Sequence, residues 1–253
     1  MRVLVTNDDG VASPGLAVLV RVARAVGGDV LVAAPAHDAS GSSAALTGAE
    51  HGGRIEAADA RPPGMPAEVA CFAVDATPGL IALAAARGRF GLPPDLVLSG
   101  VNRGPNTGRA VLHSGTVGAV LTSATHGIEG LAVSLAAADP AHWDTAEACA
   151  LATLRMLLAA PSRGRAANLN VPDLPLSDVR GVRRARLAAF GAAQAHVEER
   201  EGGEVVVAYS SPDESPDDDT DAALLARGWA TLTLVTAPTS DDTSPLGPVA
   251  LPG

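Results

Sequence analysis

Residues 2–10 read Arg2-Val3-Leu4-Val5-Thr6-Asn7-Asp8-Asp9-Gly10. The apolar run at its start is typical of a buried parallel strand. Ser13-Pro14, a few residues further on, is typical of a helix start, with an N-cap residue followed by proline at the first helical position. The stretch therefore predicts the first strand and helix of an open α/β sheet. Ligands bind at the carboxyl ends of the strands in such sheets, which is where Asp8 and Asp9 lie.

Two interpretations of Asp8-Asp9 remain open at this point. Adjacent carboxylates repel each other and are often held by a hard cation such as Mg²⁺ or Mn²⁺, which takes oxygen ligands. The same residues also form ordinary Asp-Asp-Gly turns, in which the carboxylates make local hydrogen bonds. The pentapeptide 6–10 alone does not distinguish a metal site from a turn. Residues at the ends of the other strands are needed to decide between the two.

Composition restricts the class of protein. The chain has 253 residues, of which 47% are hydrophobic, enough for a buried core in one large or two small domains. The net charge is −10, and every basic residue is an arginine. An acidic surface repels phosphate backbones, so nucleic-acid polymers are poor candidate partners. Small phosphate esters remain candidates if a metal supplies positive charge.

The cysteines and the apolar runs of the sequence bear on where the protein is located and on whether it associates with a membrane. Cys71 and Cys149 lie in a strand-like and a helix-like run, and we expect both to be core thiols. The start of the sequence shows no basic-then-apolar leader, and no stretch of about 18 uncharged apolar residues occurs. We therefore expect no membrane partner and a cytoplasmic location.

Strand and helix patterns alternate along residues 1–175 and predict a mostly parallel sheet flanked by helices. Residues 48–66 read as a surface excursion. Further strands are expected at 29–35, 68–74, 95–100, 129–136 and 167–172. Helices are expected at 14–26, 78–87, 115–127 and, capped at its start, 144–160.

Beyond residue 175 the pattern changes. We expect residues 176–253 to contain a ribbon, an acidic linker, and a last helix and strand that rejoin the core or exchange between subunits. Strand-like runs at 187–190 and 204–209 predict an antiparallel ribbon outside the main sheet. The acidic run 211–219 reads as a solvated linker rather than a metal site. A short helix at 220–227, a half-buried strand at 229–236 and an extended or disordered tail are expected to follow.

Polar residues follow three of the predicted strands. Asp8 and Asp9 follow the first, Ser40 lies in the turn-rich loop 37–43 after the second, and Asn102 begins a glycine-punctuated loop after residue 100. The helix start Ser114-Gly115-Thr116 presents free N–H groups and hydroxyls that suit a phosphate. Plain capping by serine and threonine explains this helix start equally well.

The sequence resembles the SurE (survival protein E) family of nucleotidases. The blocks that carry the resemblance stand in the family's order from residue 1 to about 240: Thr6-Asn-Asp-Asp-Gly10, Ala34-Pro35, Ser40-Gly41, Leu98-Ser-Gly-Val-Asn-Arg-Gly104, Asn106, Ser114-Gly-Thr-Val-Gly-Ala119, Ala132-Val-Ser134, Leu169-Asn-Val-Pro-Asp173 and Thr220-Asp221.

The resemblance implies a Rossmann-like α/β fold and metal-dependent hydrolysis of nucleoside monophosphates. It implies one divalent cation per subunit, Mg²⁺ or Mn²⁺, held by Asp8, Asp9, Ser40 and Asn102, with Asp8 and Asp9 as the catalytic residues. It implies that phosphate oxygens are bound by Asn106, Ser114, Gly115 and Thr116. It also implies a homodimer or homotetramer whose subunits exchange C-terminal elements.

Departures from the family pattern leave the substrate open. Ala76-Thr-Pro-Gly-Leu-Ile81 stands where the family tends to read Gly-Thr-Pro-Ala-Asp-Cys, Thr122-Ser123 replaces a Glu-Gly pair, and 36–39 lacks the usual Asp-Arg-x-Gln character. The alternatives are a phosphatase for another phosphorylated metabolite and a metal or nucleotide-binding protein with reduced hydrolysis.

Two mechanistic questions also stay open. Attack by water is favoured over an aspartyl-phosphate on Asp8, because a carboxylate bound to a cation is a poorer nucleophile. His113 stands where the family usually has tyrosine. It is either a general acid for the leaving alkoxide or a neutral histidine packed in the tyrosine's place, in the core or just outside the ligand set.

Overall fold

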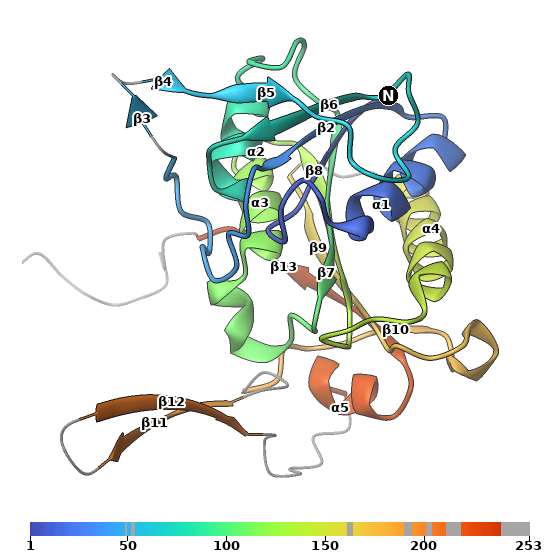
Figure 1. Ribbon diagram of the computed structural model, residues 1–253. Coiled ribbons are helices and arrows are strands. Elements are labelled where there is room, and N and C mark those ends of the chain that lie inside the picture. The colour runs from blue at the N-terminus through green and yellow to red at the C-terminus, as the bar shows by residue number, and fades with distance from the viewer. Residues whose placement is uncertain are drawn as a thin grey trace, which may run out of the picture.

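A computed structural model of the protein describes residues 1–48, 50–51, 54–160, 164–189, 194–200, 204–210 and 219–238. Within these ranges nine strands form one sheet, in the order β10-β13-β9-β8-β7-β1-β2-β6-β5 (Figure 1). Their bounds are β1 Arg2–Thr6, β2 Asp29–Pro35, β5 Ala57–Asp59, β6 Ala70–Val74, β7 Leu96–Arg103, β8 Glu129–Leu135, β9 Ala166–Val171, β10 Val182–Arg184 and β13 Ala230–Val235.

The central strands β6-β2-β1-β7-β8-β9 are all parallel to their neighbours. In chain order this is the arrangement third, second, first, fourth, fifth, sixth, which is that of the doubly wound Rossmann fold. The order reverses between β1 and β7, and in folds of this kind ligands bind in the crevice at the carboxyl ends of these two strands. The sheet is completed by β5 and β13, which run antiparallel to β6 and β9.

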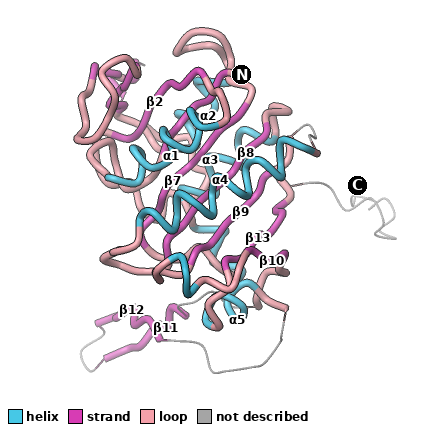
Figure 2. The backbone as a smooth tube through the Cα atoms, turned by 90° about the vertical axis from the view of Figure 1, so that its right-hand side faces the viewer, coloured by secondary structure: helices cyan, strands magenta, loops and turns pink. Residues whose placement is uncertain are grey.

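Helices cover both faces of the sheet (Figures 1 and 2). One face carries α1 Pro14–Ala25 and α4 Trp143–Ala159, and the other carries α2 Pro78–Ala86 and α3 Gly115–Ala124. Val3 and Val5 of β1 belong to the core cluster on the α1 side, whereas Leu4 belongs to the cluster on the other side. Burial of both faces explains why the strand is apolar without alternation.

Smaller elements lie outside this core. The ribbon of β11 Gln194–Arg200 and β12 Glu204–Ser210 is antiparallel and projects from the body in Figure 1. The other short elements are β3 Glu50–His51, β4 Arg54–Ile55, α5 Asp221–Ala226 and the 3₁₀ turns η1 Gly108–His113 and η2 Leu176–Asp178. No helix in the described ranges is long and apolar enough to cross a membrane.

The predicted fold class is confirmed, with corrections in the C-terminal part. The predicted ribbon is present, but its first strand is β11 at 194–200 rather than 187–190, of which residue 190 lies outside the described ranges. A strand that was not predicted, β10, forms at 182–184. β10 consists of exposed residues that pair with β13, so no apolar pattern marks it. The first four residues of β13 are buried rather than alternating, because both faces of the strand are covered: Ala230 and Leu232 belong to the core cluster on the α1 side, and Thr231 and Thr233 are buried on the other face. The predicted linker 211–218 and the tail beyond 238 lie outside the described part.

Three smaller corrections concern the core. The excursion 48–66 contains β5, an exposed edge strand that adds to the sheet. The strand predicted to end at residue 100 continues to Arg103, because pairing with β8 resumes after a bulge between Gly100 and Asn102. α4 has no side-chain cap, and the carboxylate of Asp173 instead accepts the N–H of His142 at 2.8 Å.

The two cysteines are core thiols, as predicted. Both Cys71 and Cys149 are buried and free. Burial raises the pKa of the Cys149 thiol to about 11, so it stays protonated at neutral pH.

A first prediction concerns Thr153 in α4. Its side chain is 2% exposed, and its hydroxyl has no hydrogen-bond partner within the described ranges. Changing Thr153 to valine keeps the shape and removes an uncompensated polar group. We expect the free energy of unfolding to rise by about 1 kcal/mol, raising Tm by about 2–4 °C in a thermal melt.

The matched control is Thr145→Val in the same helix. Thr145 is equally buried, but its hydroxyl donates to the Leu174 carbonyl at 2.8 Å. This change is expected to lower stability by about 1 kcal/mol or more, because it removes a hydrogen bond that is made. Equal shifts in both variants would contradict the assignment of the Thr153 hydroxyl as unpaired.

Candidate active site

The site lies where the strand order reverses. Because β2, β1 and β7 are neighbours, Ser40 after β2, Asp8 and Asp9 after β1, and Asn102 in β7 stand on three adjacent strand ends. The loops after β1 and β2 are joined directly, since the Ala39 N–H donates to the Asp8 carbonyl at 2.8 Å. The four predicted metal ligands therefore belong to one edge of the sheet.

Asp8 connects this edge to the start of α3. The carboxylate is only 4% exposed. One oxygen accepts the N–H of Thr116 at 3.0 Å, and the other accepts the Thr116 hydroxyl. Residues 8 and 116 are thus in contact although 108 positions separate them in the sequence.

The helix start at 114–116 has two roles in the structure. Ser114 is the N-cap of α3 and accepts the N–H of Val117 at 3.1 Å, so the capping interpretation is correct for its hydroxyl. Gly115 lies against Asp8, and a Cβ at this position would stand 2.9 Å from the Asp8 carboxylate. Only glycine lets this turn approach Asp8 so closely. Phosphate binding at the turn stays a prediction.

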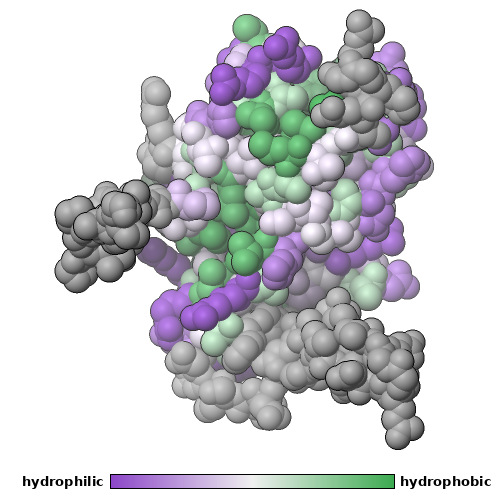
Figure 3. Space-filling model, turned by 90° about the vertical axis from the view of Figure 1, so that its left-hand side faces the viewer, coloured by the Kyte–Doolittle hydropathy of each residue, from purple (hydrophilic) through white to green (hydrophobic). Residues whose placement is uncertain are grey.

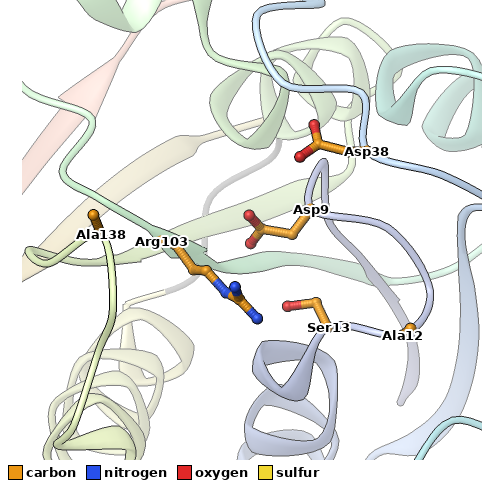
Figure 4. A pocket seen from close by; sticks show the side chains of 6 residues that line it. All are labelled: Asp9, Ala12, Ser13, Asp38, Arg103 and Ala138. Atoms are coloured by element: carbon orange, nitrogen blue, oxygen red, sulfur yellow. The ribbon is translucent and has the colours of Figure 1, made fainter.

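Asp9 faces a separate cavity of about 390 Å³ (Figure 4). In the close-up Arg103 and Ser13 lie on one side of its carboxylate and Asp38 lies on the other. This volume is near the lower end of the range for small-molecule sites, about 300–1,000 Å³. The lining residues are Asp9, Ala12, Ser13, Asp38, Arg103 and Ala138.

The electrostatics of the two carboxylates favour a cation. Burial raises the pKa of Asp8. Burial, and then the charge of Asp8, raise the pKa of Asp9 from 3.8 to about 6. Asp9 Oδ2 is buried and has no hydrogen-bond partner among the described residues. An ionised pair of this kind is costly to bury, and a hard cation would offset that cost.

The two predicted neutral ligands, Asn102 and Ser40, have a chemistry that fits such a cation. The Asn102 amide Nδ2 donates to the carbonyls of Arg103 at 3.1 Å and Gly104 at 2.8 Å, so its Oδ1 is the side-chain atom left for a ligand. Bulges often re-aim side chains near active sites, and Asn102 follows the bulge in β7. Ser40 is exposed.

No three His, Cys, Asp or Glu side chains converge in the part of the chain that the structure describes. The predicted donor set, two carboxylates with neutral oxygens, would suit Mg²⁺ or Mn²⁺ better than zinc.

Asn106 is held by residues that the sequence reasoning did not assign to the site. Its N–H donates to Asn170 Oδ1 at 2.7 Å, and its carbonyl accepts from the side chains of Asn168 at 2.8 Å and Asn170 at 2.9 Å. Its own side chain donates to Ser134 Oγ at 2.9 Å. The available signal was the occurrence of polar residues inside the otherwise apolar runs 129–136 and 167–172.

Three further site residues were missed for a different reason. Ser13, Asp38 and Arg103 line the cavity beside Asp9. The pKa of Asp38 is lowered by hydrogen bonds from Ser40, whose N–H is 2.7 Å from the carboxylate. Ser13 was assigned only as a helix cap, and Arg103, which ends β7, stands inside the family block 98–104 but was given no role of its own.

His113 does not pack in the core. It ends η1, its side chain is exposed, and its carbonyl accepts the Ser43 N–H at 3.2 Å. The interpretation as a buried replacement for tyrosine is therefore wrong, because this end of η1 lies at the surface. Its roles as a general acid or as a residue just outside the ligand set stay predictions.

The fold and site together define an α/β protein of Rossmann-like topology with paired carboxylates at the switch point of the sheet. A sequence model described as Survival protein SurE matches residues 3–194, and the chain belongs to this family. The proposed resemblance is thereby confirmed.

Named relatives share most of the chain. A protein named 5'-nucleotidase SurE 1 from Burkholderia lata is 42% identical over 186 residues, covering 72% of this chain and 68% of the relative. A protein named 5'/3'-nucleotidase SurE from Edwardsiella ictaluri is 37% identical over 237 residues, covering 92% of this chain and 89% of the relative. The crystal structure of the SurE protein from Aquifex aeolicus superposes with a TM-score of 0.79 over 96% of both chains, at 23% identity, which supports the fold.

Proposed function

We propose that the protein is a divalent-metal-dependent phosphomonoesterase that hydrolyses nucleoside monophosphates, a 5'/3'-nucleotidase. The observation that carries the proposal is the pair Asp8 and Asp9 at the switch point. Asp8 contacts the start of α3, and Asp9 has a buried oxygen without a hydrogen-bond partner among the described residues. The names of the relatives from Burkholderia lata and Edwardsiella ictaluri support the same activity.

In this proposal Asp8, Asp9, Ser40 and Asn102 hold one Mg²⁺ or Mn²⁺ ion. Such a cation, when bound, polarises a phosphoryl oxygen and favours ionisation of water. Thr116 keeps Asp8 in place through its N–H and hydroxyl, so the carboxylate does not have to reorganise.

The chain's own residues would bind and orient the phosphate ester. Asn106 and the α3 start Ser114-Gly115-Thr116 would bind phosphate oxygens, helped by the positive end of the helix dipole. Because the N–H and hydroxyl of Thr116 donate to Asp8, a phosphate at this turn would share the Thr116 donors with that carboxylate. The Arg103 side chain brings a positive charge to the cavity beside Asp9, where a substrate's leaving group would extend (Figure 4).

One observation favours a second candidate, a phosphatase for another phosphorylated metabolite. None of the six residues that line the described cavity is aromatic, so the cavity offers no ring on which a nucleobase would stack. Its lining of Ser13, Asp38 and Arg103 suits a polar leaving group such as a sugar.

Release of phosphate from a panel of esters tests both candidates. The panel contains purine and pyrimidine 5'- and 3'-monophosphates, sugar phosphates and an aryl phosphate, each with Mg²⁺, with Mn²⁺ and with EDTA. We expect metal-dependent release, fastest from nucleoside monophosphates. Faster release from sugar phosphates would favour the second candidate, and no release from any ester would leave only a binding function.

We also propose a homodimer or homotetramer that exchanges C-terminal elements, with residues 1–175 as the metal and phosphate-binding core. The ribbon β11-β12 projects from the body and pairs with no other described strand (Figure 1). Hydrophobic atoms also gather on the face that α2 and α3 cover (Figure 3). Light scattering that gives the mass of a monomer would contradict this assembly. The cytoplasmic location stays a prediction.

A further inference from the structure

Asp221 is a buried carboxylate that belongs neither to the metal ligands nor to the substrate residues above. It is the first residue of α5 and is 0% exposed. Its Oδ1 accepts the N–H groups of Ala222 at 2.8 Å and Ala188 at 2.9 Å. Its Oδ2 accepts the N–H of Gly108 at 2.8 Å. One side chain thus joins three segments of the chain.

Capping of α5 does not account for these contacts. Thr220 is already the N-cap, since its hydroxyl accepts the N–H of Ala223 at 3.4 Å. Burying a carboxylate is costly unless hydrogen bonds compensate it, and two of the three donors to Asp221 come from outside the helix. The hydrogen bonds from Gly108 and Ala188 therefore hold those two segments in place rather than capping the helix.

Gly108 closes the turn that begins at Asn106. The backbone of Gly108 has φ +58°, in the left-handed region that favours glycine. Asn168 and Asn170 of β9 hold the peptide groups of Asn106 from one side, and Asp221 holds Gly108 from the other. The turn is fixed at both ends by groups that do not face the cavity.

The same turn leads to the second half of the predicted substrate site. η1 starts at Gly108 and ends at His113, directly before the N-cap of α3 at Ser114. A shift at Gly108 would therefore change the distance between Asn106 and the start of α3. Both must face one phosphate group if both are to bind it, and small misplacements of this kind are costly in catalysis.

We propose that Asp221 is a positioning residue for phosphate-ester binding. It fixes the 106–108 turn so that Asn106 and the α3 start can bind the same phosphate group. The proposal rests on the function proposed above. Asp221 acts through the Gly108 N–H and does not touch substrate or cation. Its loss should therefore weaken substrate binding and leave cation binding unchanged.

The test compares Asp221→Asn with Asp219→Asn. Asp219 lies two residues earlier, and its side chain is 67% exposed, so it controls for the loss of one charge in this segment. Asparagine keeps the shape of residue 221 but turns an NH₂ group toward one of the three donors. We expect KM for an aryl phosphate to rise about tenfold or more in Asp221→Asn, as for loss of a hydrogen bond to a charged group, with a smaller change in kcat.

Two further readouts separate positioning from general damage. The rise in Tm on adding Mn²⁺ should equal that of the wild type in both variants. Combining Asp221→Asn with Asn170→Ala should raise KM by less than the product of the single effects, because both residues act through one turn. Multiplicative effects, an unchanged KM in Asp221→Asn, or a loss of Mn²⁺ stabilisation would each overturn the proposal.

Hydrogen exchange gives a test that requires neither activity nor a folded variant. In the wild type the Gly108 amide should exchange much more slowly than amides in exposed turns, because it donates to a buried carboxylate. Exchange as fast as in those turns would refute the contact itself. Failure of the proposed function would give a different result. The wild type would then release no phosphate from any ester, although its Gly108 amide is protected from exchange.

Discussion

Changing Asp9 to asparagine is expected to lower the rate of metal-dependent phosphate ester hydrolysis by at least about 100-fold. Loss of residues that merely support metal ligands already costs about 10–100-fold in affinity or activity, and Asp9 supplies one of only two predicted anionic ligands. The change keeps the side-chain shape, so the loss reports on charge. Excess Mn²⁺ should restore activity only in part.

Stability should respond in the opposite sense when no metal is bound. The raised pKa of Asp9, about 6 against 3.8, means that its ionised form destabilises the native state above about pH 6. Below about pH 4 the penalty vanishes, because the folded and unfolded chains then both hold the proton. At pH 7 in EDTA, Asp9→Asn should therefore melt no lower than the wild type, yet gain less in Tm from Mn²⁺.

Asp38→Asn is the matched control for this prediction. Asp38 lines the same cavity and the change removes the same charge, but Asp38 is not a predicted ligand; it supports the predicted ligand Ser40 by accepting its N–H at 2.7 Å. We expect the change to reduce the Mn²⁺-dependent rise in Tm by less than Asp9→Asn does. If the wild type shows no rise in Tm at millimolar Mn²⁺ or Mg²⁺, residues 7–10 form only a turn and the metal site is wrong.

Changing Gly118 to alanine is expected to damage both stability and activity, although alanine is normally the better helix residue by about 1 kcal/mol. A Cβ on Gly118 would stand 2.2 Å from the Ser43 carbonyl oxygen and 2.7 Å from the Ala44 nitrogen. These are backbone atoms, so α3 and the loop after β2 would have to separate. Overpacking of this kind costs about 1–3 kcal/mol.

The loss of activity follows from what the two segments carry. Ser43 is held by hydrogen bonds to the carbonyls of Leu112 and His113, and the loop it closes contains Ser40. The other partner, α3, begins with the predicted phosphate-binding turn at Ser114. Moving them apart by about 1 Å should lower turnover by about 100-fold.

Thr122→Ala in the same helix is the control for Gly118→Ala. Thr122 is half-buried, and alanine there causes no clash. The gain in helix propensity offsets the loss of the hydrogen bond that the Thr122 hydroxyl donates to the Gly118 carbonyl at 2.8 Å. Circular dichroism melts and turnover of an aryl phosphate should show losses in Gly118→Ala alone. A Gly118→Ala protein as stable and active as the wild type would show that the close packing of α3 on the 40–44 loop is incorrect.

The sequence by itself determined the local elements and the residues attached to them. β2 has the predicted bounds of 29–35, and α1 begins at Pro14 after its N-cap Ser13, because periodicity and capping act over a few neighbouring residues. Asp8 and Asp9 could be placed at a strand end for the same reason. The other predicted ligands, Ser40 and Asn102, could be grouped with Asp8 and Asp9 only through the resemblance to the family.

Only the tertiary structure decided which distant groups meet. Thr116 with Asp8, Asn170 with Asn106, and Asp221 with Gly108 are contacts across 108, 64 and 113 residues. Such contacts depend on strand order and on close packing at Gly115 and Gly118, and no local pattern encodes them. β10 was missed for the same physical reason: an exposed strand of arginines is stabilised by its neighbour β13 rather than by its own composition.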